Sequence, residues 1–369
     1  MTHYVPRALA FFLNLRYDYG RTFFSPYSRK GVITVRNLRT FEDSLFPHEL
    51  RWVYALSNAA ADAKLVHDGK KEEFSVVAPR LYPGFEKVNA VSRMGVMNLM
   101  IPVGCNATCP DICYTDIVNW KRDPGHITFP ELLGILEEFQ AMGGKWIRIV
   151  GDGEPVLYKQ LGQLCQWTRE CGINLLVFSN GVSISKSILR EYERGNLYFY
   201  IKLWSENAEV QNKMVAPRTP YRYIDDGKLG PAPRAFYELY DINTERVGFE
   251  VLASSVNLED ARQIVNGPKA EVPLFVEPFI AEGSGKGHYE FIAKSPVVTK
   301  QCEQPPRASY LGVVNSKGEL QPGTLVPEGA VSVKGRKLKE TWSNIFTSSE
   351  LFFRARYSAG CFCETMRNY

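Results

Sequence analysis

Six short apolar runs, separated by stretches of helical pattern, dominate the sequence after residue 96. The runs are Met97–Val103, Trp146–Val150, Asn174–Phe178, Leu197–Leu203, Val247–Leu252 and Leu274–Glu277. Continuous apolar strands with helices between them are typical of a parallel sheet that is covered on both faces. Polar segments follow several runs, at the strand ends where an α/β barrel places its reacting groups. The sequence therefore predicts an α/β fold that contains a partial (β/α)6 barrel.

The helix between the first two runs has clear signals at both ends. Thr128 and Glu131 have the spacing of a capping box, and Gly143-Gly144 follows the apolar stripe. A second helical pattern, LGQLCQWTRECG, carries Cys165 and Cys171, and we expect both cysteines to serve packing. The segment GKLGPAPR, residues 227–234, contains several glycines and prolines and is expected to form a surface loop.

The segments on either side of the barrel have a different pattern. The N-terminal extension is expected to be mainly helical, with helices at Tyr4–Tyr19 and Pro47–Asp68. In the C-terminal region, SYLGVVNSKGELQPG has the pattern of strands around a turn at Ser316–Gly318, and LKETWSNIF that of a short helix. We therefore expect three parts, which are the extension at 1–96, the barrel at 97–295 and the C-terminal region at 296–369.

The composition is that of a globular protein, with 45% apolar and 23% charged residues in a chain of 369. A net charge of +4 without a long lysine or arginine run does not indicate nucleic-acid binding. No uninterrupted apolar stretch reaches the roughly 18 residues that a membrane-spanning helix needs. The eight cysteines are clustered, as in intracellular proteins that bind metals or do redox chemistry. We expect a cytoplasmic protein that binds neither membranes nor nucleic acid.

Three cysteines lie within nine residues directly after the first run, in CNATCPDIC at 105–113. A disulfide would use two of them, and a structural zinc site normally takes four nitrogen or sulfur ligands. An iron–sulfur cluster with one open iron needs three thiolates that converge from one loop. The spacing favours a 4Fe–4S cluster on Cys105, Cys109 and Cys113, with zinc or plain reduced thiols as the alternatives.

Four further motifs follow later runs in order: GDGEP at 151–155, SNG at 179–181, IKLWSEN at 201–207 and EVLASSVNLED at 250–260. With the cysteine loop they resemble the radical S-adenosylmethionine superfamily over most of residues 97–280. The cysteine spacing departs from the usual one, because the second gap holds three residues, Pro110-Asp111-Ile112, instead of two. Ile112 stands where the family has an aromatic residue, and Tyr114 comes just after it.

The resemblance implies a site for S-adenosylmethionine at the ends of the strands. It implies that the turn receives the methionine part, with Glu154 facing its ammonium group; a carboxylate that only braces the loop is the alternative. It also implies that Lys202 faces the cofactor's carboxylate and that Ile112 or Tyr114 covers the adenine. The cofactor-binding residues that it implies are Ile112, Tyr114, Gly151, Asp152, Gly153, Glu154, Ser179, Asn180, Lys202 and Ser205.

A second cysteine group, Cys302, Cys361 and Cys363, lies in the C-terminal region. Many members of the superfamily carry there an extension, called SPASM or twitch, that binds auxiliary clusters. The segment VVNSKGELQPG resembles the hairpin of that extension, although Gly323 stands where a cysteine is frequent. The resemblance implies one auxiliary iron–sulfur cluster on these three cysteines. The alternative is a surface tail and an unrelated Cys302.

The resemblance implies an enzyme that cleaves S-adenosylmethionine reductively at a 4Fe–4S cluster and abstracts a hydrogen atom from its substrate. The reaction that we expect is an oxidative modification, such as dehydrogenation, cross-linking or carbon–heteroatom bond formation, of a peptide or small biosynthetic intermediate. The expected partner is a reductant protein such as flavodoxin or ferredoxin. An electron-transfer or cluster-carrier protein and a zinc-stabilised binding module are the alternatives, and no catalytic residue is assigned.

Overall fold

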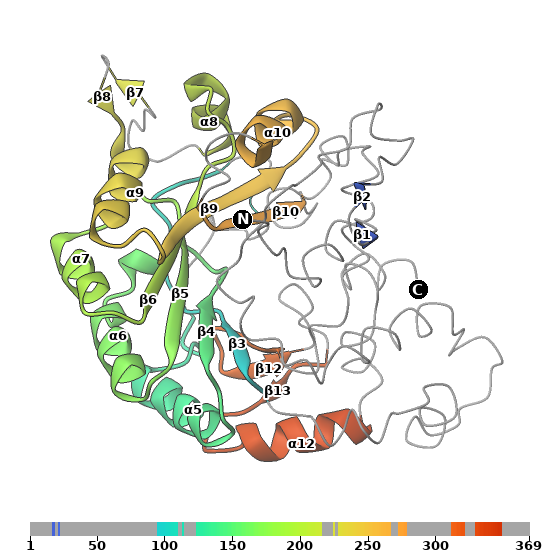
Figure 1. The fold of residues 1–369 in the computed structure, drawn as a ribbon. Coiled ribbons are helices and arrows are strands. Elements are labelled where there is room, and N and C mark those ends of the chain that lie inside the picture. Colours follow the sequence, from blue (N-terminus) through green and yellow to red (C-terminus); the bar gives the residue numbers. More distant parts are fainter. Residues whose placement is uncertain are drawn as a thin grey trace. The chain divides into compact units, whose positions relative to one another are not determined.

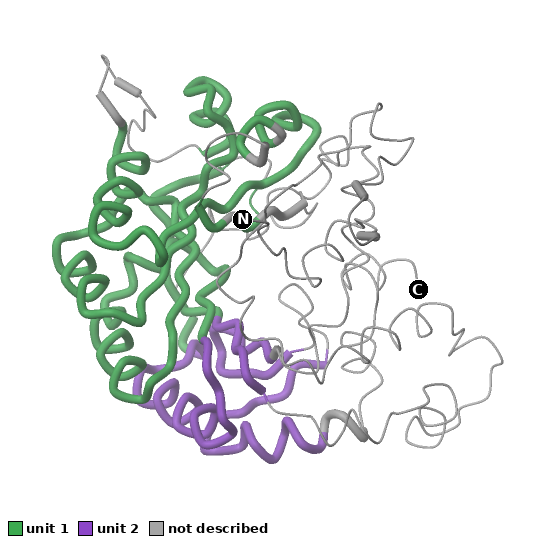
Figure 2. Tube along the Cα trace, viewed as in Figure 1, with its two compact units in different colours: residues 1–43, 100–124, 147–301 green, residues 44–99, 125–146, 302–369 purple. Residues whose placement is uncertain are grey.

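The computed structural model describes residues 94–109, 113, 123–215, 228–266, 272–278, 311–321 and 329–348, together with the short pieces 17–18, 21–22 and 224–225. The chain divides into two compact units (Figure 2). Unit 1 contains residues 1–43, 100–124 and 147–301, and unit 2 contains residues 44–99, 125–146 and 302–369.

The sheet of unit 1 is built from the predicted apolar runs. Its strands follow in the order β4 (Trp146–Ile149), β5 (Asn174–Ser179), β6 (Leu197–Lys202), β9 (Val247–Ala253) and β10 (Leu274–Pro278). The pairs β5–β6, β6–β9 and β9–β10 are parallel. The prediction of an α/β fold with mostly parallel strands is thereby confirmed. The strand order is open, so the described strands do not close a barrel.

The helical elements of unit 1 are the 3-10 turn η4 (Pro155–Leu157), α6 (Leu161–Glu170), α7 (Lys186–Glu193), α8 (Ala208–Met214), α9 (Pro231–Ile242) and α10 (Leu258–Asn266). Helices α6, α7 and α9 cover one face of the sheet (Figure 1). Helix α6 packs on β5, α7 on β6, and α9 on β6 and β9. Phe199 of β6 faces Tyr192 of α7, and Phe249 of β9 stacks on Phe236 of α9 with 4.0 Å between ring centroids.

Residues that alternate with these apolar side chains point to the other side of the sheet, here called the inner face. Two register pairs belong to it, Phe178 with Tyr200 and Lys202 with Glu250. Arg148 lies over the rings of Phe178 and Phe275, at 5.3 and 5.2 Å from their centroids. The inner face therefore carries aromatic rings and charged groups, whereas the helix-covered face is apolar.

Unit 2 combines β3 (Val96–Leu99) with three strands from the C-terminal region. β11 (Leu311–Val314) runs parallel to β3, and β12 (Glu319–Gln321) and β13 (Val331–Ser332) follow as antiparallel neighbours. The turn between β11 and β12 is closed by Asn315, whose Oδ1 accepts from the backbone N–H groups of Lys317 and Glu319 at 3.0 Å. The predicted strands and the predicted turn in this segment are confirmed.

The two helices of unit 2 are α5 (Phe129–Ala141) and α12 (Leu338–Ser348). The capping box of α5 is confirmed, since the Thr128 N–H donates to Glu131 Oε2 at 2.8 Å and the Glu131 N–H donates to Thr128 Oγ1 at 3.4 Å. Helix α12 begins with Leu338, whose backbone N–H donates to Glu138 Oε2 of α5 at 2.6 Å. An acidic side chain of one helix thus supplies an acceptor for the free N–H groups of the other.

Two sequence-based expectations need correction. Residues 227–234 are not a loop, because β7 (Ile224–Asp225) pairs with β8 (Lys228–Leu229) and α9 begins at Pro231. Proline suits a first helical turn, and the residues after it bury against the sheet. The helix expected at Tyr4–Tyr19 is wrong at its end, where β1 (Tyr17–Asp18) pairs with β2 (Arg21–Thr22). Gly20 stands between these strands in the sequence and suits a tight turn.

The other expectations for the extension, including the helix at Pro47–Asp68, lie outside the described residues. The division of the chain at residues 96 and 295 stays a prediction. Among the described residues, no helix is both long enough and apolar enough to cross a membrane.

Candidate cofactor site

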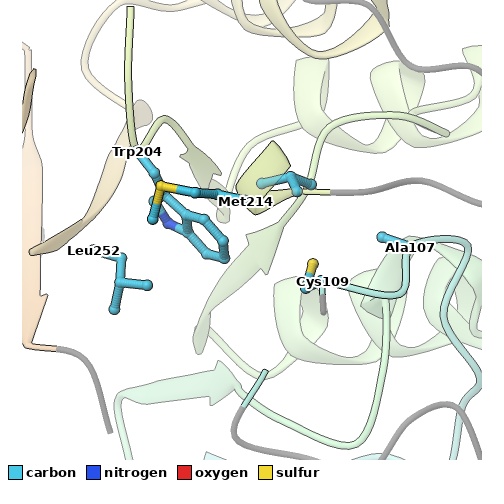
Figure 3. Packing of buried hydrophobic residues seen from close by; sticks show 6 residues of the cluster. Ala107, Cys109, Trp204, Met214 and Leu252 are labelled. Atoms are coloured by element: carbon cyan, nitrogen blue, oxygen red, sulfur yellow. The ribbon is translucent and has the colours of Figure 1, made fainter. Parts of the chain in front are cut away.

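The cysteine loop of unit 1 gathers its thiols in one apolar cluster. Cys109 is buried in a cluster with Ala107, Trp204 and Leu252, and Cys105 and Cys113 pack against this cluster. Figure 3 shows Cys109 between Ala107 and the side of the cluster that holds Trp204 and Leu252. The Cys113 N–H donates to the Cys109 carbonyl at 3.2 Å, which bends the loop back on itself. Residues far apart in sequence thus surround the cysteines.

Burial makes free thiolates unfavourable in this loop. It raises the pKa of the Cys105 thiol to about 11 and that of the Cys109 thiol further, although the positive charge of Lys202 lowers both. A metal that binds here would therefore displace protons from these thiols. Among the described residues, no group of three or more His, Cys, Asp or Glu side chains has metal-binding geometry. Residues 110–112 and 114–122, which flank Cys113, lie outside the described part of the chain.

The GDGEP turn after β4 packs directly against the backbone of the cysteine loop. Gly151, Asp152 and Gly153 all have positive φ values, of 73°, 55° and 142°. A Cβ atom on Gly153 would overlap the carbonyl oxygens of Val103 and Gly104. The Glu154 N–H donates to the Gly104 carbonyl at 3.0 Å. This close approach requires glycine at position 153.

Glu154 is the most heavily bonded acidic residue of this region, and it is only 2% exposed. Its Oε1 accepts from the Ser179 hydroxyl at 2.7 Å and from the Val156 N–H at 3.4 Å. Its Oε2 accepts from the Asn180 N–H at 2.8 Å. Burial raises the pKa of Glu154, and these hydrogen bonds and Lys202 offset part of that rise. In this structure Glu154 braces the loop, and its contact with the ammonium group of the cofactor stays a prediction.

Asn180 extends this network to the cysteine loop. Its Nδ2 donates to Asn106 Oδ1 at 2.7 Å and lies 4.0 Å from the Cys105 sulfur. Asn106 in turn donates to the Ser183 hydroxyl at 2.8 Å. Sequence reasoning did not single out Asn106 or Ser183. The one available signal for Asn106 was its position between two of the cysteines.

Lys202, at the end of β6, forms an ion pair with Glu250. Its Nζ lies 3.6 Å from Glu250 Oε1 on the neighbouring strand and 5.2 Å from the centre of the Trp204 ring. The sequence motif of the fifth strand begins with Glu250, but sequence reasoning gave this residue no role. Lys202 thus pairs with a buried carboxylate, and its charge also acts on the thiols of Cys105 and Cys109.

Ser205 is held by the loop that leads into α8. Its backbone N–H and that of Trp204 both donate to Gln211 Oε1 at 2.9 Å. Its hydroxyl accepts from the Asn207 N–H at 2.9 Å. The hydroxyl thus has the turn-forming role that short polar side chains commonly take.

The structure brings most of the predicted site residues together in unit 1. Hydrogen bonds link Cys105, Glu154, Ser179 and Asn180, and Lys202 acts electrostatically on Cys105, Cys109 and Glu154. Ser205 is in the next loop, beside Trp204. The roles of these residues in binding stay predictions. Outside the described residues lie Ile112, Tyr114, Cys302, Cys361 and Cys363.

Comparison with known proteins agrees with this picture, although no family model matches the chain. An S-adenosylmethionine-dependent nucleotide dehydratase of Lacinutrix mariniflava is 29% identical over 190 residues, which are 50% of this chain and 38% of the relative. The matches span 38% to 57% of the lengths of the two curated relatives found.

Two solved structures of radical S-adenosylmethionine enzymes share the fold. The structure of SuiB of Streptococcus suis, bound to its precursor peptide SuiA, has a TM-score of 0.52 at 13% identity. The match covers 85% of this chain and 80% of the SuiB chain. The structure of anSMEcpe with bound AdoMet and the Kp18Cys peptide has a TM-score of 0.50 at 14% identity. The match covers 72% of this chain and 89% of the anSMEcpe chain. The curated relatives are named as S-adenosylmethionine-dependent dehydratases, and this chain shares the fold of the two solved structures.

Proposed function

We propose that this chain binds a 4Fe–4S cluster through Cys105, Cys109 and Cys113 and uses it with S-adenosylmethionine. The observation that carries the proposal is the network that ties the cysteine loop to the turn after β4 and to the end of β5. In that network Glu154 and Asn180 are bonded to each other, and Asn180 reaches the Cys105 sulfur. Glycines at the turn allow a close approach of backbone and ligand.

The donor set fits an iron–sulfur cluster. Three thiols pack around one apolar group, and soft thiolates are the ligands that such clusters require. When bound, the cluster and S-adenosylmethionine supply reductive cleavage of the cofactor, with an electron from a reductant protein such as flavodoxin or ferredoxin, and hydrogen-atom abstraction from the substrate.

The residues of the chain have positioning roles in this proposal. Glu154, Ser179 and Asn180 hold the turn Gly151–Gly153 in place, so that its backbone can receive the methionine part of the cofactor. Lys202 supplies a positive charge for the cofactor's carboxylate and shares that charge with Glu250. Trp204 and Leu252 exclude water from the sulfur atoms. Ile112 or Tyr114 covers the adenine.

The substrate that the comparisons favour is a nucleotide, since the curated relative carries the name nucleotide dehydratase. Removal of water leaves the oxidation level of a substrate unchanged, so a dehydration does not need an auxiliary cluster as electron acceptor. A peptide is the second candidate, because SuiB binds a precursor peptide and shares the fold over 85% of this chain. Oxidation of a peptide would give a clear role to an auxiliary cluster on Cys302, Cys361 and Cys363.

The two substrate classes can be separated with reconstituted enzyme under anaerobic conditions. We expect the four ribonucleoside 5′-triphosphates, tested singly, to include one that accelerates 5′-deoxyadenosine formation and yields a product lighter by one water. A set of unstructured synthetic peptides serves as the comparison. Stimulation by peptides alone, with products that have lost hydrogen, would favour the peptide candidate and support the auxiliary cluster.

A further inference from the structure

Two buried polar atoms beside Lys202 have no hydrogen-bond partner among the described residues. They are Glu250 Oε2 and Trp204 Nε1, on side chains that belong to residues only 2% and 3% exposed. An unsatisfied buried donor or acceptor costs about 1–3 kcal/mol, so native proteins leave few of them. Native proteins commonly pair such atoms with an ordered water, an ion or a group of a bound ligand.

Several polar groups around these two atoms have hydrogen-bond partners. Both oxygens of the neighbouring Glu154 accept hydrogen bonds, as does Gln211 Oε1 in the loop after β6. Asn257, which donates to the Trp204 carbonyl at 2.6 Å, is also fully engaged through both of its side-chain groups. The backbone N–H and carbonyl of Trp204 thus both have hydrogen-bond partners, whereas its indole N–H has none among the described residues.

The two side chains are connected to the cysteine loop through Lys202 and through the apolar cluster. Glu250 is the register partner of Lys202 on the inner face, and Lys202 lies over the Trp204 ring. Trp204 packs in the same group as Cys109. A ligand group that meets both atoms would therefore lie on the inner face next to the cysteine loop, where hydrogen abstraction would take place.

We propose that Glu250 and Trp204 form a substrate subsite for a hydroxyl-bearing group, with a hydroxyl donating to Glu250 Oε2 and a ligand oxygen accepting from Trp204 Nε1. This inference rests on the proposed function and adds the part of the substrate that is recognised. A carboxylate repels a phosphate, and an N–H donor with a lysine beside it disfavours an ammonium group. A sugar hydroxyl, which both donates and accepts, satisfies the whole set.

Three substitutions test the subsite in the reconstituted holoenzyme. Glu250→Met removes the acceptor at similar volume, Glu250→Gln keeps an amide oxygen, and Trp204→Phe removes the N–H but keeps a ring over Lys202. Matched controls elsewhere are Glu191→Gln, which breaks an ion pair with Arg169, and Trp146→Phe, which alters a tryptophan that is 3% exposed. Dissociation constants are measured for S-adenosylmethionine and for each ribonucleoside triphosphate and its 2′- and 3′-deoxy forms.

A hydrogen bond to a charged group typically corresponds to a tenfold to hundredfold change in affinity. We expect Glu250→Met to weaken binding of the preferred ribonucleotide about that much, Trp204→Phe about threefold to tenfold, and Glu250→Gln less than Glu250→Met. The preference for the ribonucleotide over one of its deoxy forms should vanish in Glu250→Met. The two control variants should stay within about twofold of the wild type in iron content, in cofactor affinity and in nucleotide affinity.

The outcomes that would contradict the subsite can be distinguished from failure of the proposed function. The cofactor also carries ribose hydroxyls, so a loss of S-adenosylmethionine affinity with unchanged nucleotide affinity would assign the subsite to the cofactor and overturn the inference. Unchanged affinity for both ligands would show that Glu250 and Trp204 contact neither the nucleotide nor the cofactor. That result would also overturn the inference. Failure of the proposed function looks different, since the wild-type protein would then bind no iron and cleave no cofactor.

Discussion

Replacing Cys105, Cys109 and Cys113 together by alanine should remove about four iron atoms per chain and abolish cofactor cleavage. The three thiols pack around one apolar cluster, and no other described cysteine shares that cluster. Alanine is smaller than cysteine and introduces no clash, so the variant should keep the far-ultraviolet circular dichroism of the wild type. Iron, sulfide and the visible absorption of the anaerobically reconstituted protein measure the loss.

The matched control is Cys165→Ala/Cys171→Ala, which changes two cysteines in and directly after α6. Cys165 is 1% exposed, and neither Cys165 nor Cys171 belongs to the apolar cluster of the cysteine loop. This variant should lose some stability because it creates small cavities, but it should bind as much iron as the wild type. A triple variant that keeps its full iron content would show that the loop at 105–113 does not hold a cluster.

Glu154→Gln is expected to destabilise unit 1 and, through the turn, to weaken S-adenosylmethionine binding. The carboxylate accepts from three donors, on Ser179, Asn180 and Val156. An amide has one oxygen and presents its NH₂ group to the remaining donors, which leaves a buried donor unmatched. The expected loss is about 1–3 kcal/mol in the free energy of unfolding. Thermal melting of the protein and titration with S-adenosylmethionine measure the two effects.

Glu170→Gln is the control, because Glu170 is an exposed residue of α6 that accepts only from Gln166 among the bonds described. It should melt and bind like the wild type. If Glu154→Gln melts like the wild type but binds the cofactor tenfold more weakly, Glu154 contacts the cofactor directly. The bracing interpretation would then be wrong. If neither property changes, Glu154 has no role in this site.

The strands of the parallel sheet could be predicted because each is a continuous apolar run between polar turns. The capping box of α5 was equally readable, since its two residues lie three positions apart in the sequence. Helix α9 was missed because Gly230 and Pro231 have the composition of a loop, whereas the burial of Ala232 and Phe236 against the sheet decides the structure. Such tertiary contacts override a local signal.

The site residues that lie in short sequence motifs could be predicted. The residues that reach the site only through the pairing of strands or the contact of loops could not. The sequence indicated Cys105, Glu154 and Asn180 because they stand in short motifs at strand ends. It gave no role to Glu250, whose importance comes from its register with Lys202, 48 positions earlier in the chain. Asn106 was missed for the same reason, because its partners Asn180 and Ser183 belong to another loop.

The most direct test of the account is whether the wild-type protein cleaves S-adenosylmethionine. The anaerobically reconstituted protein is given S-adenosylmethionine and dithionite, and 5′-deoxyadenosine and methionine are quantified by chromatography. The account predicts equal amounts of both products, formed only with the reductant and absent from the triple cysteine variant. A protein that holds iron on the three cysteines but forms no 5′-deoxyadenosine would contradict it and favour a cluster carrier.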